Sequence, residues 1–245
     1  PVMSSWRLHA DYQHLQDDFG SLERIFCLEG KQITRDPISE VIRIERDGVG
    51  FYVKRYRRAK GWRAYLPRPR IKAEWQNLQH FTDWGIPTAQ IIARGMERKA
   101  GAFVRGAMVT REIPGTDDLA HLAYHKDTRL QDRSWVNEVS RQIADFTRTL
   151  HQHGFVHNDL KWRNILVDQQ RRAYLIDCPT GGFWWGPFLQ YRIVKDLACL
   201  DKVGKYQLSR SQRLRFYLHY VQRQQLTPAD KKRIAKIVRF FAGRE

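Results

Sequence analysis

Apolar and polar positions alternate through much of the first half of the chain, which indicates β-strands. Residues 41–46 and 51–56 flank the turn signal Asp-Gly-Val-Gly, so we predict a β-hairpin there. Residues 88–95 and 102–113 predict two further strands, separated by the turn-like stretch 96–101. Between these pairs, Ile71, Trp75, Leu78 and Phe81 recur at helical spacing, which predicts a helix over 70–85 that ends at Gly85.

The second half shows mainly helical periodicity. Residues 134–154 predict a long amphipathic helix, with Ser134 as its N-cap and Gly154 as its end. Two short apolar runs at 164–168 and 173–178 predict a small hairpin. Residues 209–243 predict two more helices, the second capped by Thr227 with Pro228 in its first turn.

These elements predict an α+β, bilobal organisation. Residues 1–114 would form a lobe built on an antiparallel β-sheet with one helix, and residues 115–245 a mainly helical lobe. The stretch 114–120, Pro-Gly-Thr-Asp-Asp-Leu-Ala, is the expected hinge. No repeat and no low-complexity segment interrupts this order.

The composition is that of a globular protein with a large excess of basic residues. Of 245 residues, 42% are hydrophobic, and no apolar run approaches the roughly 20 residues that span a bilayer. We expect no secretory signal, and we expect the three cysteines to be reduced thiols. Lysine and arginine number 43 against 26 acids, a net charge of +17, which favours an anionic partner.

The stretch between the long helix and the small hairpin carries the densest polar chemistry. Residues 157–164 fit the spacing H-x-D-x-x-x-x-N, and Asp177 follows 18 residues after Asp159. Upstream, Lys54 lies on a predicted strand and Glu74 on the next helix. Three histidines in this stretch raise the alternative of a zinc site, but His151, His153 and His157 do not have zinc-ligand spacing.

Each of these residue types has a role in phosphoryl transfer, which needs an oriented nucleophile and neutralised phosphate charge. Asp159 would accept the proton of an acceptor hydroxyl, and Lys161 would meet the transferred phosphate. Asn164 and Asp177 offer the oxygen ligands that Mg²⁺ prefers. Lys54, aimed by Glu74, would hold the α- and β-phosphates of ATP.

The pattern resembles the protein-kinase-like fold and, more narrowly, the bacterial lipopolysaccharide core kinases, which phosphorylate heptose or Kdo sugars. The resemblance rests on FYVKRY (51–56), KAEWQNLQHFTDWGIPT (72–88), HNDLKWRNILVD (157–168) with AYLIDC (173–178), and RIVKDLACL (192–200). It implies adenine binding by the backbone of Glu112 and Ile113, and it implies that Asp196 braces the catalytic loop.

The chain departs from typical protein kinases in informative ways. No G-x-G-x-x-G lies between the first strands, where Gly30 alone would serve. Asn158 replaces the arginine that reads a phosphorylated activation loop, which argues against that form of regulation. Asp177 is followed by Cys178 and Pro179, and the stretch after it leaves little room for docking a peptide. These departures favour a sugar or another small molecule as the acceptor.

Residues 55–72 hold eight lysines and arginines and no acid, interleaved with Tyr56, Trp62 and Tyr65. This region is either a solvated linker or a surface for phosphorylated lipid A–core or for an anionic membrane leaflet.

The sequence thus predicts an ATP- and Mg²⁺-dependent kinase of a lipopolysaccharide inner-core sugar. It would act in the cytoplasm, peripherally on the inner membrane, with no nucleic-acid partner. The alternatives are another small-molecule phosphotransferase, or a non-catalytic kinase-like module that binds anionic lipid or nucleic acid. A protein kinase fits less well because the peptide-docking elements are missing.

Overall fold

The computed structural model describes residues 1–58 and 60–244, which form two compact units. The first unit comprises Pro1–His80 and Ala89–Pro114, and the second comprises Phe81–Thr88 and the chain from Gly115 onward. The first unit ends at Pro114, whereas the segment 81–88 belongs to the second unit, where the Pro87 carbonyl accepts a hydrogen bond of 2.8 Å from the Leu175 amide.

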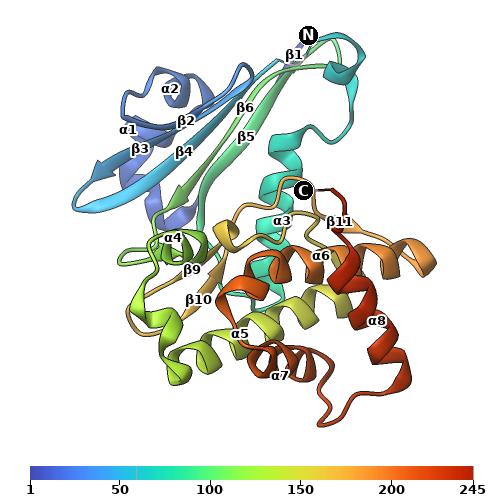
Figure 1. Ribbon diagram of the computed structural model, residues 1–245. Coiled ribbons are helices and arrows are strands. Elements are labelled where there is room, and N and C mark those ends of the chain that lie inside the picture. The colour runs from blue at the N-terminus through green and yellow to red at the C-terminus, as the bar shows by residue number, and fades with distance from the viewer. Residues whose placement is uncertain (59, 245) are drawn as a thin grey trace. The chain divides into compact units, whose positions relative to one another are not determined.

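The first unit is built on an antiparallel six-stranded sheet with the order β1-β5-β6-β4-β3-β2 (Figure 1). Its strands are β1 (Val2–Leu8), β2 (Lys31–Arg35), β3 (Ser39–Arg46), β4 (Val49–Arg57), β5 (Ile91–Lys99) and β6 (Ala102–Arg111). The predicted hairpin is confirmed as β3 and β4. Its two-residue turn puts Asp47 and Gly48 at positive φ, as a primed turn requires.

Alternation along the strands puts one set of side chains into a core on one face of this sheet. Ile42, Ile44, Phe51 and Val53 are buried there. Two short helices, α1 (Gln16–Phe19) and α2 (Leu22–Cys27), add Phe19, Leu22 and Ile25 to the same core. No helical pattern predicted α1 and α2, because four and six residues are too few to establish a period.

Three local predictions differ from the structure. Residues 96–99 continue β5, so only Ala100 and Gly101 form the turn before β6. The first two strands of the β2-β3-β4 meander are joined at Asp36–Ile38, so Gly30 precedes β2 and does not lie in this connection. The N-cap of the long helix is Asp132, whose carboxylate accepts from the Ser134 and Trp135 amides.

The helix between the two strand pairs is confirmed as α3 (Arg70–Asp83), followed by Gly85 at positive φ. Two 3₁₀ turns, η1 (Ala10–Leu15) and η2 (Gly61–Tyr65), complete the first unit.

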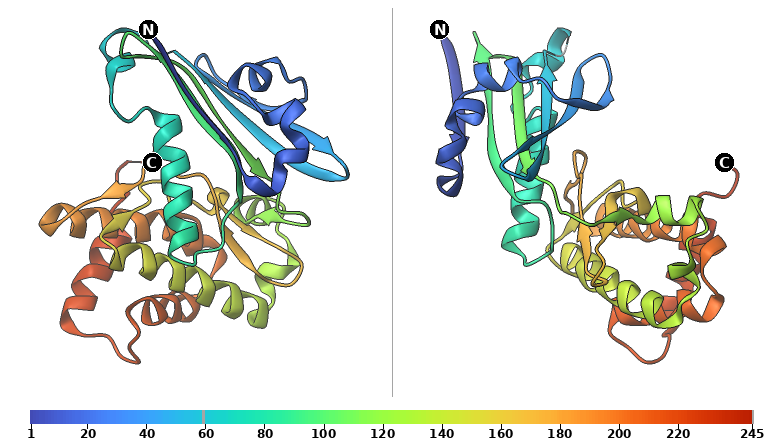
Figure 2. Two further views of the ribbon diagram at one scale, coloured as in Figure 1. Left: turned by 180° about the vertical axis from the view of Figure 1, so that it is seen from behind. Right: turned by 90° about the vertical axis from the view of Figure 1, so that its left-hand side faces the viewer.

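The second unit is mainly helical. Its helices are α4 (Leu119–Tyr124), α5 (Arg133–Gln152), α6 (Gly186–Gln207), α7 (Arg210–Val221) and α8 (Pro228–Arg239), with 3₁₀ turns η3 (Thr128–Gln131) and η4 (Trp162–Asn164). Thr227 caps α8, as predicted. Helices α5 and α7 lie side by side in the views of Figures 1 and 2. Ala144, Ile193, Leu197, Tyr217 and Tyr220 form a core cluster between α5, α6 and α7.

Short strands carry the polar loops of this unit. β9 (Ile165–Val167) lies between β10 (Ala173–Leu175) and β7 (Asp117–Asp118), and β8 (Phe155–Val156) pairs with β11 (Gly182–Phe183). The predicted small hairpin is therefore confirmed as β9 and β10. Within the described residues, we find no helix with the length and apolar character needed to cross a membrane.

Candidate active site

The loop that links β8 to β9 is organised around one buried carboxylate. Asp196 of α6 is fully buried and accepts hydrogen bonds of 2.9 Å from the backbone amides of His157 and Asn158. The ring of His151 lies 2.9 Å from the same carboxylate and 2.6 Å from the Tyr220 hydroxyl. A buried charge requires such partners, and in return it holds the loop backbone in one conformation.

Asp159, Lys161 and Asn164 lie together in this loop. The Nζ of Lys161 is 3.1 Å from a carboxylate oxygen of Asp159. The Asn164 amide donates to the Asp159 carbonyl at 2.8 Å and lies 3.4 Å from its other carboxylate oxygen. Asn164 is buried, whereas the Asp159 and Lys161 side chains are 32% and 55% exposed. The carboxylate is thus oriented from within the protein and open to a ligand from outside.

The hairpin of β9 and β10 brings Asp177 next to this group. Asn164 immediately precedes β9, and its carbonyl accepts from the Ile176 amide at 2.9 Å. Asp177 follows directly, is exposed, and has a positive φ of 49°. The side-chain nitrogen of Asn164 already donates to Asp159, so the side-chain oxygen of Asn164 is the atom that can bind a ligand. An amide oxygen beside a carboxylate is a donor set that fits Mg²⁺.

The Asn158 side chain ties three segments together. Its amide donates to the Thr180 carbonyl at 2.9 Å, and its oxygen accepts from Arg192 of α6 at 3.2 Å. The Arg192 guanidinium lies 3.8 Å from the ring centre of Trp184. A positive φ of 66° suits asparagine here. The residue that replaces the expected arginine therefore connects the loop to the segment after Asp177.

The three histidines at the end of α5 and in this loop have structural roles. His157 is fully buried, its Nδ1 accepts from the Asp159 amide at 3.2 Å, and burial lowers the pKa of its ring. His153 stacks on Trp84 with ring centres 4.2 Å apart, and His151 is held by Asp196 and Tyr220. Each histidine thus has its own set of partners, which does not favour a shared zinc ion.

The first unit contains the predicted lysine and glutamate as an ion pair. Lys54 on β4 binds Glu74 on α3, and Glu74 is fully buried. The Tyr56 hydroxyl donates to the second Glu74 oxygen at 3.0 Å, and burial together with Glu74 raises the pKa of Tyr56. Two donors therefore fix the Glu74 carboxylate, and the carboxylate in turn fixes the Lys54 ammonium.

Glu112 and Ile113 follow the end of β6. The Glu112 amide donates to the Gly50 carbonyl at 2.9 Å, and its carboxylate binds Arg43 on β3. The amide is thus committed to the sheet, and adenine recognition by this backbone stays a prediction.

The connection between β2 and β3 occupies the place where a phosphate-covering loop was expected. Asp36 accepts from the amides of Ile38 and Ser39 at 2.9 and 2.8 Å and from the Ser39 hydroxyl at 2.7 Å. These hydrogen bonds lower the pKa of Asp36, and the one from the Ser39 hydroxyl contributes most. A side-chain-capped turn therefore replaces a glycine-rich loop.

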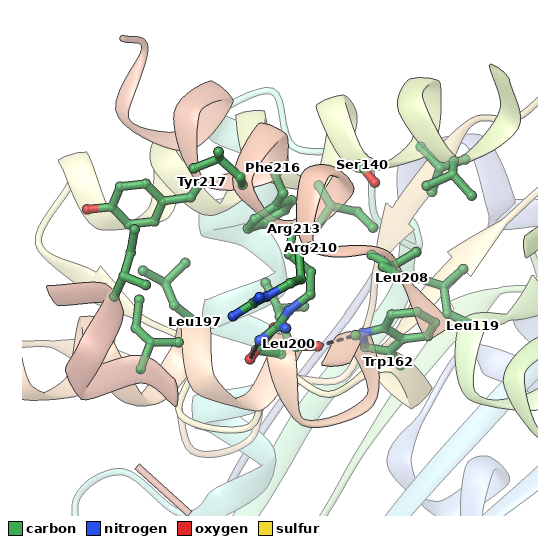
Figure 3. A pocket seen from close by; sticks show the side chains of 18 of the residues that line it. Leu119, Ser140, Trp162, Leu197, Leu200, Leu208, Arg210, Arg213, Phe216 and Tyr217 are labelled. Atoms are coloured by element: carbon green, nitrogen blue, oxygen red, sulfur yellow. Dashed lines mark hydrogen bonds and ion pairs between the residues drawn. The ribbon is translucent and has the colours of Figure 1, made fainter. Parts of the chain in front are cut away.

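An apolar cavity of about 370 Å³ lies among the helices of the second unit (Figure 3). Its walls come from α4, α5, α6, α7 and α8 and include Leu197, Leu200, Leu208 and Phe216. An Arg213–Asp201 ion pair with two contacts of 2.7 Å stands among them. Trp162 also lines the cavity, but the carboxylates of Asp159 and Asp177 do not. The cavity suits an apolar ligand better than a nucleotide.

Sequence reasoning missed Tyr56 as a partner of Glu74, and it missed Arg192 and Trp184 as partners of the loop. Tyr56 lies two residues after Lys54 on the same face of the strand, so the period of β4 was a usable signal. Arg192 had no such signal, because it comes from a helix 34 residues beyond Asn158.

Comparison with known proteins agrees with this geometry. The chain is 27% identical over 116 residues to a 3-deoxy-D-manno-octulosonic acid kinase of Vibrio cholerae, which covers 47% of this chain and 46% of that protein. It is 25% identical over 105 residues to a probable serine/threonine-protein kinase of Fowlpox virus, covering 43% and 33%. The chain thus aligns with less than half the length of these curated relatives.

A solved structure of WaaP in complex with acyl carrier protein matches over 96% of this chain and 97% of that chain. The TM-score is 0.77 at 22% identity, so the fold is protein-kinase-like. The sequence pattern described as the lipopolysaccharide kinase (Kdo/WaaP) family matches residues 28–237. The chain therefore belongs to the lipopolysaccharide kinase (Kdo/WaaP) family.

Proposed function

We propose that this protein transfers the γ-phosphate of ATP to a hydroxyl of a lipopolysaccharide inner-core sugar. The observation that carries the proposal is the group formed by Asp159, Lys161 and Asn164 beside Asp177. It offers an oriented carboxylate, a cation and two oxygen ligands, which together meet the needs of phosphoryl transfer. The family assignment supports the same reaction class.

In this proposal Asp159 orients the acceptor hydroxyl and accepts its proton, while Lys161 stabilises charge on the transferred phosphate. Asn164 and Asp177 hold Mg²⁺, which when bound neutralises phosphate charge. Lys54 binds the α- and β-phosphates, and Glu74 and Tyr56 keep it in place. Glu112 and Ile113 are proposed to bind adenine through backbone atoms.

Kdo is the acceptor that we propose over heptose, because the Vibrio cholerae relative is a 3-deoxy-D-manno-octulosonic acid kinase. A sugar carboxylate also suits a chain of net charge +17. The same charge argues against cationic acceptors such as aminoglycosides, and so against that alternative phosphotransferase.

The test is transfer of labelled phosphate from ATP to purified core acceptors that end in Kdo or in heptose, with mass mapping of the product. We expect label on Kdo, and Asp159→Ala should lower turnover by roughly 100- to 10,000-fold while the circular dichroism spectrum stays unchanged. Asp17→Ala, which removes an exposed aspartate of α1, is the matched control. Full turnover by Asp159→Ala would refute the assignment.

Two partners accompany this function in our proposal. One is an anionic membrane leaflet, where the inner-core acceptor is anchored by lipid A. Trp62 and Tyr65 of the basic region 55–72 are 72% and 61% exposed, as such a contact requires. Association with the cytoplasmic face of the inner membrane would follow.

The other proposed partner is an acyl carrier protein, as in the matched WaaP structure. The apolar cavity of the second unit could receive the acyl chain that such a protein carries. Calorimetric titration with acylated and unacylated carrier protein tests this: the acylated form should bind more tightly, and Leu200→Trp should remove the difference by filling the cavity.

A further inference from the structure

An unusual set of exposed aromatic side chains lies at the start of α6. Trp185, Phe188 and Tyr191 are spaced three residues apart and are 73%, 64% and 53% exposed. Large aromatic side chains normally bury most of their surface, so three adjacent exposed rings need a reason. None of the three belongs to the proposed catalytic group.

The C-terminal end of the described chain adds to this set. The Tyr191 ring lies 5.5 Å from that of Phe240, which directly follows α8, and the Phe240 and Phe241 rings are 5.0 Å apart. Lys202 stands 5.0 Å from the Phe241 ring, and Arg244 stands 5.4 Å from that of Phe240. Both cations are exposed.

We name these residues the aromatic–basic surface: Trp185, Phe188, Tyr191, Lys202, Phe240, Phe241 and Arg244. Residues 178–195 contain no acid, and neither do residues 231–244. Exposed rings and cations, with no carboxylate in either of these two stretches, complement an interface that has an apolar interior and an anionic surface. A bilayer of acidic phospholipids has that structure, and tryptophan and tyrosine prefer its headgroup region.

We propose that the aromatic–basic surface binds the headgroup region of an anionic bilayer and holds the second unit on it. This inference rests on the proposed function, which requires a lipid-anchored acceptor. The surface is connected to the proposed catalytic loop through α6, because this helix also supplies Asp196 and Arg192. Lipid bound at the first turn of α6 would therefore place the proposed catalytic loop near the membrane that carries the acceptor. The aromatic–basic surface does not include the basic region 55–72, which belongs to the first unit.

The experiment is co-sedimentation of the full chain with vesicles of phosphatidylethanolamine and phosphatidylglycerol, compared with vesicles of phosphatidylcholine alone. We expect binding to the anionic vesicles and a blue shift of tryptophan emission. Trp185→Ala with Phe188→Ala should weaken binding by at least tenfold and reduce the blue shift. Lys202→Glu with Arg244→Glu should weaken it most at low salt, since each lost cation is worth about fivefold.

Tyr124→Ala and Arg133→Ala are the matched controls, because both remove exposed side chains of the second unit away from the surface. Unchanged vesicle binding by the aromatic double variant would overturn the inference, as would loss of acyl carrier protein binding while vesicle binding persists. Phosphate transfer to a soluble Kdo acceptor separates the two proposals: the surface variants should retain it, and only its absence in the unaltered protein would count against the proposed reaction.

Discussion

At the scale of single residues, the proposed chemistry depends on side chains that their partners hold in one orientation. Glu74 shows this most clearly, since it is fully buried and held by both Lys54 and Tyr56. A buried carboxylate that loses its cation is left uncompensated, and this costs more than the pair itself contributes.

We therefore expect Lys54→Met to abolish phosphate transfer and also to lower the free energy of unfolding by about 3 kcal/mol. Adding Glu74→Gln should restore much of the stability, because it removes the stranded charge, but none of the activity. Urea unfolding and ATP turnover of both variants are the measurements. A double variant as unstable as Lys54→Met would contradict the role assigned to the buried charge.

Arg192 is a positioning residue in this account, since it acts on the loop through Asn158 and Trp184. Arg192→Ala should lower kcat by roughly 10- to 100-fold and leave the KM for ATP unchanged, because the acceptor side of the loop loses its support. Arg192→Lys should recover part of kcat by keeping the charge over Trp184. A parallel rise in the KM for ATP would point to general damage instead.

Phosphorylation should not be needed for activity, because Asn158 makes its bonds to Thr180 and Arg192 without a phosphate. Protein treated with phosphatase should turn over at the rate of untreated protein.

At the scale of elements, α8 begins with a capping box, and its acidic residue Asp230 also has partners outside the cap. Asp230 exchanges hydrogen bonds with Thr227 and also accepts from the Tyr217 hydroxyl at 2.8 Å and from Arg223. Burial alone would raise the pKa of Asp230, but these hydrogen bonds outweigh it and hold the pKa well below its usual range.

Because the folded-state pKa of Asp230 lies below the unfolded value, its stabilisation is present above about pH 4 and is lost as pH falls towards the folded-state pKa. Asp230→Asn should lower the free energy of unfolding by about 2 kcal/mol at pH 7 and by less at pH 3. Urea unfolding across this pH range tests the prediction, with Asp17→Asn as control. An equal loss of unfolding free energy at pH 7 and pH 3 would mean that the charge of Asp230 does not contribute to stability.

At the scale of the whole molecule, the net charge of +17 leaves two readings, a kinase with an anionic acceptor and a basic binding module. ATP with Mg²⁺ at 100 times its Kd should stabilise a kinase by about 2.7 kcal/mol, and ATP with EDTA should stabilise it less. Thermal unfolding measures both. Salt-sensitive binding of nucleic acid with no response to ATP would favour the module.

The amino-acid sequence by itself determined the longer periodic elements around the site and the order of the proposed catalytic residues. The hairpins, α3 and the H-x-D-x-x-x-x-N loop followed from periods of two and 3.6 residues and from turn residues, all of which act over a few neighbours. The pairing of Lys54 with Glu74 also followed, since a strand and the next helix supply it.

The tertiary structure alone decided what holds these residues in place. His151 with Tyr220, Arg192 with Asn158, and Tyr191 with Phe240 join residues 34 to 69 positions apart, and the apolar cavity is lined from five helices. No local pattern encodes such contacts, because they depend on how helices pack and which side chains are buried between them.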